Sequence, residues 1–165
     1  VMVPMVESAT ETREAVEAAR YPPEGSRGVA GTRASAYGRD LGEYVATAND
    51  EITLVVQIET QTGLDNVDEI AAVDGVDALF VGPADLSANL GVFGQFESDV
   101  FRGAVETILA AGEETATPVG TLATSPEGVD RYCAWGFDYL IAGTDAGHIQ
   151  RGVSNLGERA REQVE

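Results

Sequence analysis

Residues 54–60 read Leu-Val-Val-Gln-Ile-Glu-Thr, and residues 79–87 read Leu-Phe-Val-Gly-Pro-Ala-Asp-Leu-Ser. Each stretch is an apolar run, without polar alternation, that leads into a segment bearing a carboxylate. Strands that are apolar throughout are typical of a parallel sheet buried on both faces. The two stretches therefore predict parallel strands of an α/β protein with polar side chains at their carboxyl ends.

The same alternation of strand and helix continues along the chain. Strands are expected at Val1–Val6, 52–58, 77–81, 118–122 and 139–142. Helices are expected at about 8–20, 40–49, 63–72, 98–111, 125–136 and from 146 to the end, with loops at 24–38 and 83–96. Five such units suit either a five-stranded doubly wound sheet or part of a (β/α)8 barrel. The 165 residues fit a single domain, whereas a complete barrel takes about 250 residues.

The charge of the chain is strongly negative. Asp and Glu total 28 and Lys and Arg total 10, which gives a formal net charge of −18. Nucleic acid is an unfavourable partner, because few groups could neutralise its phosphates. No apolar run is long enough for a membrane helix. The acid excess predicts a solvated surface adapted to a cytoplasm of high salt concentration, that is, a halophilic protein.

Residue types also limit the chemistry. All ten basic residues are Arg, so the chain has no Lys for a Schiff base. The single Cys133 cannot form an internal disulfide, which favours a reduced, cytoplasmic setting, and its neighbours Tyr132 and Trp135 favour a place in the core. His148 is the only histidine, and its position near the start of the last helix favours an ordinary surface or packing role. Carbonyl chemistry would then need a metal or hydrogen bonds.

Two carboxylates are candidates for a metal site. Gln57 and Glu59 lie two residues apart at the end of one strand and so face the same way. Asp85 follows the next strand, and the carboxyl ends of neighbouring parallel strands meet at one edge, where active sites of such folds lie. Paired carboxylates repel unless a cation lies between them, and Mg²⁺, Mn²⁺ or Co²⁺ would suit. Spacing alone leaves the alternative open that Glu59 caps a helix and Asp85 closes a turn.

Several motifs occur together in a fixed order. They are Val3-Pro4-Met5-Val6-Glu7, the segment from Tyr21 to Gly28, Arg33-Ala34 with Tyr37-Gly38, Gln57-Ile58-Glu59-Thr60, and Val81-Gly82-Pro83-Ala84-Asp85-Leu86-Ser87. With them the chain resembles the HpcH/HpaI aldolase family, which includes 4-hydroxy-2-oxoheptanedioate aldolase and aldolases of 2-keto-3-deoxy sugar acids. The resemblance covers nearly the whole chain. It implies a (β/α)8 TIM barrel of the phosphoenolpyruvate/pyruvate type, of which this chain would be the C-terminal two-thirds.

The resemblance also implies roles for individual residues. Glu59 and Asp85 match the ligands of a divalent metal, Gln57 matches a residue that contacts the pyruvate moiety, and the Ala84 backbone matches part of the site for the substrate carboxylate. A class II aldolase of this kind cleaves 4-hydroxy-2-oxo acids to pyruvate and an aldehyde through an enolate that the metal stabilises. Members are homo-oligomers, typically hexamers, that exchange their last helix.

The chain departs from the family pattern in one respect. The family's catalytic His and its transition-state-stabilising Arg lie upstream of the strand that contains Val1, and His148 does not match that His. A polypeptide of these 165 residues would leave two strand edges uncovered, so we expect it to be inactive or poorly folded alone. Two alternatives stay open: an enzyme of the citrate lyase β-chain or malyl-CoA lyase type, and a non-catalytic remnant.

Overall fold

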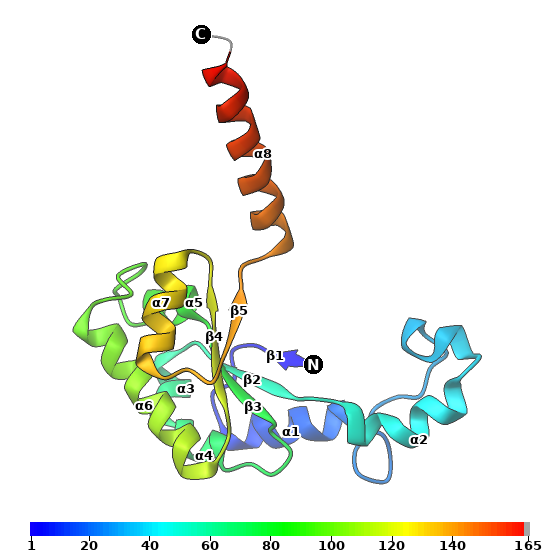
Figure 1. Cartoon of the computed structure of the whole chain (residues 1–165). Helices are drawn as coiled ribbons and strands as arrows, with labels where there is room; N and C mark the ends of the chain where they lie inside the picture. The colour runs from blue at the N-terminus through cyan, green and yellow to red at the C-terminus, as the bar shows by residue number, and fades with distance from the viewer. Residues whose placement is uncertain (164–165) are drawn as a thin grey trace.

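The strands form one parallel sheet in chain order. The computed structural model describes residues 1–163. Its strands are β1 (Met2–Val3), β2 (Val55–Ile58), β3 (Ala78–Val81), β4 (Val119–Ala123) and β5 (Tyr139–Ala142), and each pairs with the next (Figure 1). A doubly wound sheet reverses its strand order at a switch point, and this sheet does not. The sequential order is that of a barrel wall, which confirms the prediction of a partial (β/α)8 barrel.

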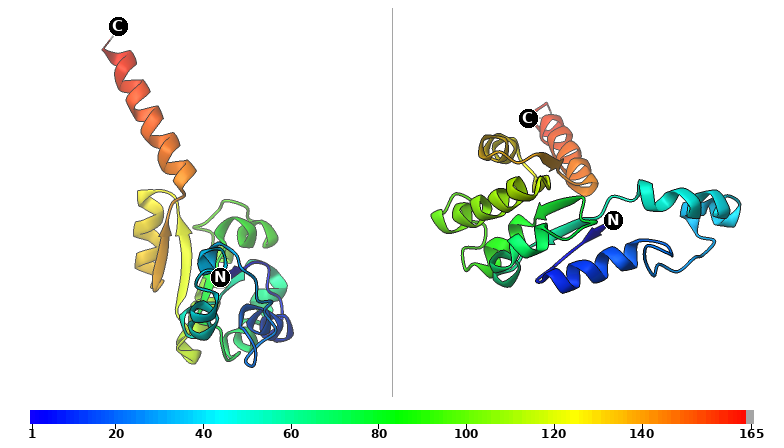
Figure 2. Two further views of the ribbon diagram at one scale, coloured as in Figure 1. Left: turned by 90° about the vertical axis from the view of Figure 1, so that its right-hand side faces the viewer. Right: turned by 90° about the horizontal axis from the view of Figure 1, so that it is seen from below.

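Helices pack along one face of this sheet (Figures 1 and 2). They are α1 (Ala9–Ala19), α3 (Gln61–Asp65), α4 (Val67–Ala71), α5 (Pro83–Asn89), α6 (Asp99–Thr115) and α7 (Pro126–Trp135). The sheet face beneath them contributes Val56, Ile58, Leu79 and Val81 to the core, all fully buried. Because the helices cover this face, the alternate side chains of each strand point to the opposite, concave face.

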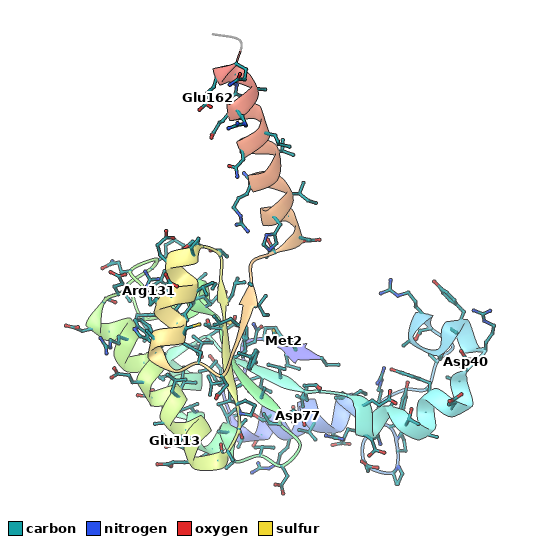
Figure 3. The ribbon with its side chains drawn as sticks, in the orientation of Figure 1. Met2, Asp40, Asp77, Glu113, Arg131 and Glu162 are labelled. Carbon is teal, nitrogen blue, oxygen red and sulfur yellow. The ribbon has the colours of Figure 1, made fainter. Side chains whose placement is uncertain are left out.

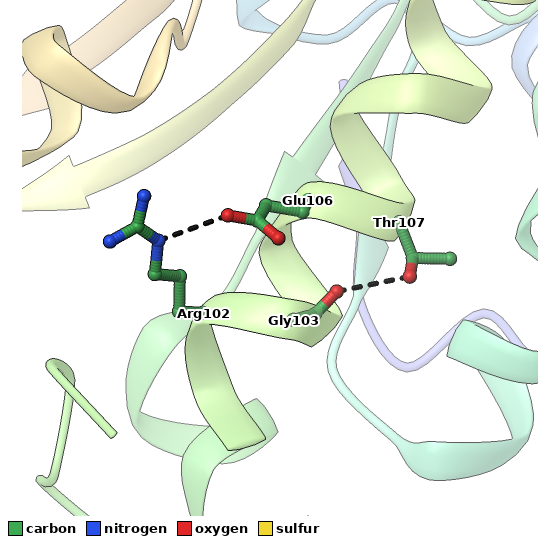
Figure 4. Close-up of polar contacts among 4 residues, drawn as sticks. All are labelled: Arg102, Gly103, Glu106 and Thr107. Atoms are coloured by element: carbon green, nitrogen blue, oxygen red, sulfur yellow. Dashed lines mark hydrogen bonds and ion pairs between the residues drawn. The ribbon is translucent and has the colours of Figure 1, made fainter. Parts of the chain in front are cut away.

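The longest of these covering helices, α6, shows how the outer layer is held. Its side chains toward the sheet recur at helical spacing and are Phe101, Ala104, Val105, Ile108 and Ala111. On the solvent side, Arg102 Nε donates to Glu106 Oε1 at 3.0 Å, and Thr107 Oγ1 donates to the Gly103 carbonyl at 3.0 Å (Figure 4). An exposed pair of this spacing contributes only about 0.3–0.5 kcal/mol. The buried stripe therefore fixes the helix.

Residues 24–51 form an arm that projects from the side of the sheet. It contains the 3₁₀ segment η1 (Arg33–Gly38) and the helix α2 (Leu41–Glu51), with the labelled Asp40 between them (Figure 3). The Asn49 side chain ties the arm to the main body, since its Oδ1 accepts from Tyr21 N at 2.7 Å and its Nδ2 donates to Tyr21 O at 3.0 Å.

The last helix, α8 (Asp145–Glu162), extends beyond the carboxyl end of β5 and packs on none of the other helices (Figures 1 and 2). It has no buried residue, and Ile149, Val153 and Leu156 are exposed. None of the helices in residues 1–163 combines the length and apolar character that a bilayer crossing needs.

Two helical predictions were wrong because of how Pro and Gly were interpreted. Residues 83–96 were expected to be a loop, but α5 begins at Pro83, since Pro is tolerated in the first turn of a helix, where its missing N–H has no partner. The helix expected to stop near Gly112 continues to Thr115. Gly112 is buried there, with the Val119 side chain and the Thr117 carbonyl filling the space beside it.

Other boundaries also differ from the prediction. The strand expected at Val1–Val6 is limited to Met2–Val3, because Pro4 has no N–H to donate and Met5 turns out of the strand with φ 56°. β2 starts at Val55 because Ile52 still closes α2. The helix expected at 63–72 divides into α3 and α4. Cys133 is exposed rather than packed in the core.

Candidate functional site

The concave face of the sheet is built in transverse rows. Gln57 pairs with Phe80, Phe80 with Gly120, and Gly120 with Tyr139, so these four residues share one row. In the next row toward the carboxyl ends, one step past the pair of Ile58 and Val81, Glu59 comes opposite Gly82. This second row forms the rim where the active sites of such barrels lie.

Glu59 is a buried carboxylate at this rim. It is 6% exposed, and its Oε2 accepts a hydrogen bond from the Met5 amide at 3.0 Å. Burial raises the pKa of Glu59, and the charge of Asp85 raises that pKa further, while the Met5 N–H partly opposes both effects. A carboxylate whose charge is disfavoured by burial and by a second carboxylate is a group that a bound cation would relieve.

Asp85 reaches the same rim from the neighbouring strand. It lies in the first turn of α5, which starts directly after β3 with Gly82 as the N-cap residue and Pro83 at the first position. Asp85 is exposed, and Leu86, which follows it, is fully buried and anchors this turn in the core. Asp85 lies three residues after Gly82, against which the Glu59 carboxylate packs, so both carboxylates belong to this part of the rim.

Gln57 and Ala84 flank the two carboxylates. Gln57 is half-buried and faces the same side of β2 as Glu59. Ala84 is exposed in the first turn of α5, where backbone N–H groups have no acceptor within the helix. An amide side chain, the first turn of a helix and two carboxylates therefore lie at one edge of the sheet.

His148 is used elsewhere. Its Nδ1 lies 2.9 Å from Arg151 Nη2, which can only donate. Its Nε2 lies 2.8 Å from the Ala142 carbonyl oxygen, which can only accept. The contact with Ala142 holds the first turn of α8 against the end of β5, and the contact with Arg151 lies within α8, so His148 is engaged in a structural role.

A cavity of about 630 Å³ lies between α6 and α7, away from the carboxylates. Its lining includes Leu109, Pro118, Trp135 and Asp138. Pro118 and Asp138 directly precede β4 and β5, so this cavity is at the amino-terminal end of the sheet. In barrels of this kind that end contributes to stability rather than to catalysis.

Within residues 1–163, no group of three or more His, Cys, Asp or Glu side chains is arranged to hold a metal ion. Two carboxylates are nevertheless a sufficient protein contribution for Mg²⁺, which commonly keeps water and substrate oxygens as its remaining ligands. Glu59 and Asp85 therefore fit a hard divalent cation, and they fit a thiol-preferring metal poorly. The sequence interpretation missed the Met5 amide and Gly82, which touch Glu59 and whose motifs gave no sign of that contact.

A parallel sheet in chain order with acidic groups at its carboxyl rim defines a (β/α)8-type protein with its site at the rim. The chain belongs to the HpcH/HpaI aldolase/citrate lyase family, whose profile matches residues 1–151. The predicted family is thereby confirmed.

Individual relatives agree with this assignment. The chain is 44% identical over 146 residues to a hydroxypyruvate/pyruvate aldolase of Roseovarius nubinhibens, covering 87% of this chain and 56% of that protein. It is 39% identical over 157 residues to a 5-keto-4-deoxy-D-glucarate aldolase of Klebsiella pneumoniae, covering 95% and 61%. A crystal structure of a family member from Burkholderia cenocepacia superposes with a TM-score of 0.87 at 36% identity, covering 97% and 64%. The chain thus spans less than two thirds of each of these proteins.

Proposed function

We propose that the protein is a metal-dependent class II aldolase that cleaves or forms 4-hydroxy-2-oxo acids, with pyruvate and an aldehyde as the other partners of the reaction. The observation that carries this proposal is that the buried Glu59 and the exposed Asp85 follow two neighbouring strands, at the carboxyl rim of a parallel sheet. Relatives named as aldolases of hydroxypyruvate and of a keto-deoxy sugar acid support it. We further propose that residues 1–165 act as a single domain.

Glu59 and Asp85 would hold the divalent cation, Mg²⁺, Mn²⁺ or Co²⁺. A bound cation of this kind supplies Lewis acidity toward the oxygens of a 2-oxo acid. The Gln57 amide would donate to an oxygen of the pyruvate moiety, and the free Ala84 N–H would donate to the substrate carboxylate. The strands and the buried start of α5 hold these groups in fixed positions, which is how positioning lowers a barrier. The absence of Lys excludes a Schiff base formed by this chain.

The test is pyruvate release from a panel of 4-hydroxy-2-oxo acids, measured by coupling to lactate dehydrogenase. Because the 165 residues alone are expected to be inactive, they are assayed joined to a segment that supplies the upstream His and Arg of the family pattern. Protein treated with EDTA should be inactive and should recover with Mg²⁺, Mn²⁺ or Co²⁺. Glu59→Gln and Asp85→Asn should lose roughly 100-fold or more in kcat/KM, because several kcal/mol of charge stabilisation would be removed. Asp99→Asn is the matched control, since Asp99 is also an exposed acid in the first turn of a helix. Activity that survives EDTA and both substitutions would disprove the proposal.

A second candidate is an enzyme acting on CoA thioesters, because the family description includes citrate lyase. The chain offers only ten Arg and no Lys for the phosphates of CoA, so the oxo acids are favoured. Assaying malyl-CoA beside the oxo acids separates the two candidates.

We also propose that the protein is cytoplasmic and halophilic and assembles as a homo-oligomer through α8, as a hexamer by family resemblance. The helix buries no residue of its own and exposes an apolar stripe of Ile149, Val153 and Leu156. Light scattering of the wild-type protein and of an Ile149→Asp variant would test the assembly. A monomeric wild-type protein would contradict it.

A further inference from the structure

The carboxylate of Glu59 is seated between two backbone segments. On one side, the Met5 amide donates to Oε2 at 3.0 Å, and Met5 is the only donor that residues 1–163 offer to this carboxylate. On the other side lies Gly82, which directly follows β3, one step beyond the pair of Ile58 and Val81. A Cβ at position 82 would lie 2.2 Å from Glu59 Oε1 and 2.8 Å from its Cδ, distances that real Cβ atoms do not show. The carboxylate therefore occupies the space that a side chain at position 82 would take.

The absence of a side chain at Gly82 has no conformational reason. Its φ of −82° and ψ of 97° are accessible to any amino acid, so the backbone alone does not require glycine. Contact with Glu59 is the constraint that remains. Alanine at this position is consequently a clean probe of that contact.

The backbone of Met5, unlike that of Gly82, is in a conformation that favours glycine. Its φ of 56° lies in the left-handed region, which is uncommon for a residue other than glycine and which clusters at functional sites. This turn separates Val3 of β1 from Val6, whose N–H donates to the Gln57 carbonyl at 3.2 Å. The strained turn aims the Met5 N–H at Glu59, while Met5 as a whole is 52% exposed.

We propose that Gly82 and the Met5 amide are positioning groups that fix the orientation of the Glu59 carboxylate. The Met5 N–H holds Oε2, and the empty position at Gly82 leaves room for Oε1, which is thereby the oxygen left free for a divalent cation. This inference rests on the proposed metal site. It predicts that a single methyl group at position 82 displaces the carboxylate without changing any ligand.

The test is Mn²⁺ binding to the wild-type protein and to Gly82→Ala, measured by electron paramagnetic resonance of free Mn²⁺. Gly82→Ala should weaken Mn²⁺ binding by about 10-fold or more, the range seen when groups that orient a ligand are altered. Gly103→Ala is the matched control, because a Cβ at Gly103 would meet nothing within 4 Å. It should bind Mn²⁺ within about twofold of wild type, far from the tenfold loss expected when an orienting group is altered.

A second measurement separates positioning from a general packing defect. Thermal unfolding in EDTA should show that Gly82→Ala lowers the midpoint in the wild-type background and has no such effect in a Glu59→Ala background. One outcome overturns the positioning inference alone: Gly82→Ala binds Mn²⁺ as tightly as wild type, whereas Glu59→Gln does not bind it. The proposed metal site would still stand in that case. If wild type binds no Mn²⁺, the proposed metal site is wrong. If Gly82→Ala also lowers the melting midpoint equally in the wild-type and Glu59→Ala backgrounds, the proposed contact between Gly82 and Glu59 is overturned as well.

Discussion

Substituting Gly120 by Ala tests the row of the concave face on which the rim is built. An ideal Cβ at Gly120 would lie 2.2, 2.2 and 2.5 Å from three ring atoms of Tyr139. The ring is not free to move away, because the Tyr139 hydroxyl donates to the Leu79 carbonyl at 2.8 Å and so joins β5 to β3 across β4. The substitution must therefore overpack the row and displace the ring from this hydrogen bond.

The expected effect combines these terms. Overpacking a tight site costs about 1–3 kcal/mol. Loss of the Tyr139 hydrogen bond destabilises the fold by about a further 0.5–1.5 kcal/mol. Replacing Gly by Ala in a strand stabilises the fold by about 0.5–1 kcal/mol. A net loss of about 0.5–4 kcal/mol follows, and for a chain of this length each kcal/mol lowers Tm by roughly 2–4 °C. Circular dichroism melting should therefore show Tm falling by roughly 1–16 °C.

The control is the same substitution in a Tyr139→Leu background, where the ring is absent. There, Gly120→Ala should be neutral or slightly stabilising, so the double-mutant cycle should return a coupling of about 0.5–3 kcal/mol. Equal losses in the two backgrounds would show that the ring contact does not determine the choice of glycine, and the reasoning from close contacts would be refuted.

Three further predictions concern charge. The pKa of Glu59 is raised in the folded state, so protonated Glu59 stabilises the fold relative to ionised Glu59. This contribution to the free energy of unfolding is fully present below the ordinary pKa of 4.5 and is lost as pH rises through the pKa of the folded state. In the absence of metal, Glu59→Gln should be more stable than wild type at pH 7, and urea titrations should show the gap closing below pH 4.5; a gap independent of pH would contradict this. Asp77→Ala should cost about 1–3 kcal/mol in urea unfolding, because Asp77 Oδ2 accepts from the buried Leu54 N at 2.6 Å, whereas the exposed Asp68→Ala should leave stability unchanged. A net charge of −18 predicts a higher Tm in molar KCl than at low salt, and equal values would count against a halophilic protein.

Strands β2 to β5 were predictable because each is a mainly apolar run between helical segments. The helix at α5 was not, since Pro83 was interpreted as a loop residue although it occupies the first position of a helix. Cys133 shows a similar limit. Its aromatic neighbour Tyr132 is buried, but successive helical residues are about 100° apart, which turns Cys133 to solvent.

The site was predictable in part. The spacing of Gln57 and Glu59 on one strand, and the location of Asp85 after the next, follow from the geometry of parallel strands. The contacts of the Glu59 carboxylate with Gly82 and the Met5 amide do not follow from that geometry. They depend on the register that sets Glu59 opposite Gly82 and on a tertiary turn at Met5, 54 residues away along the chain. Such contacts are properties of pairing between distant segments and leave no local pattern in the sequence.

The same contacts explain why a cation would matter to the fold as well as to chemistry. Glu59 is buried, it has one hydrogen-bond donor, and it is near Asp85, so its charge opposes folding at neutral pH. Natural selection for stability alone would favour an uncharged residue at position 59, with a side chain at position 82 filling the space. A carboxylate held there against its own desolvation, with a glycine opposite and a strained turn beside it, is therefore the signature of a group kept for binding. A cation at this rim would turn an unfavourable charge into a favourable one, coupling metal binding to the stability of β2 and β3.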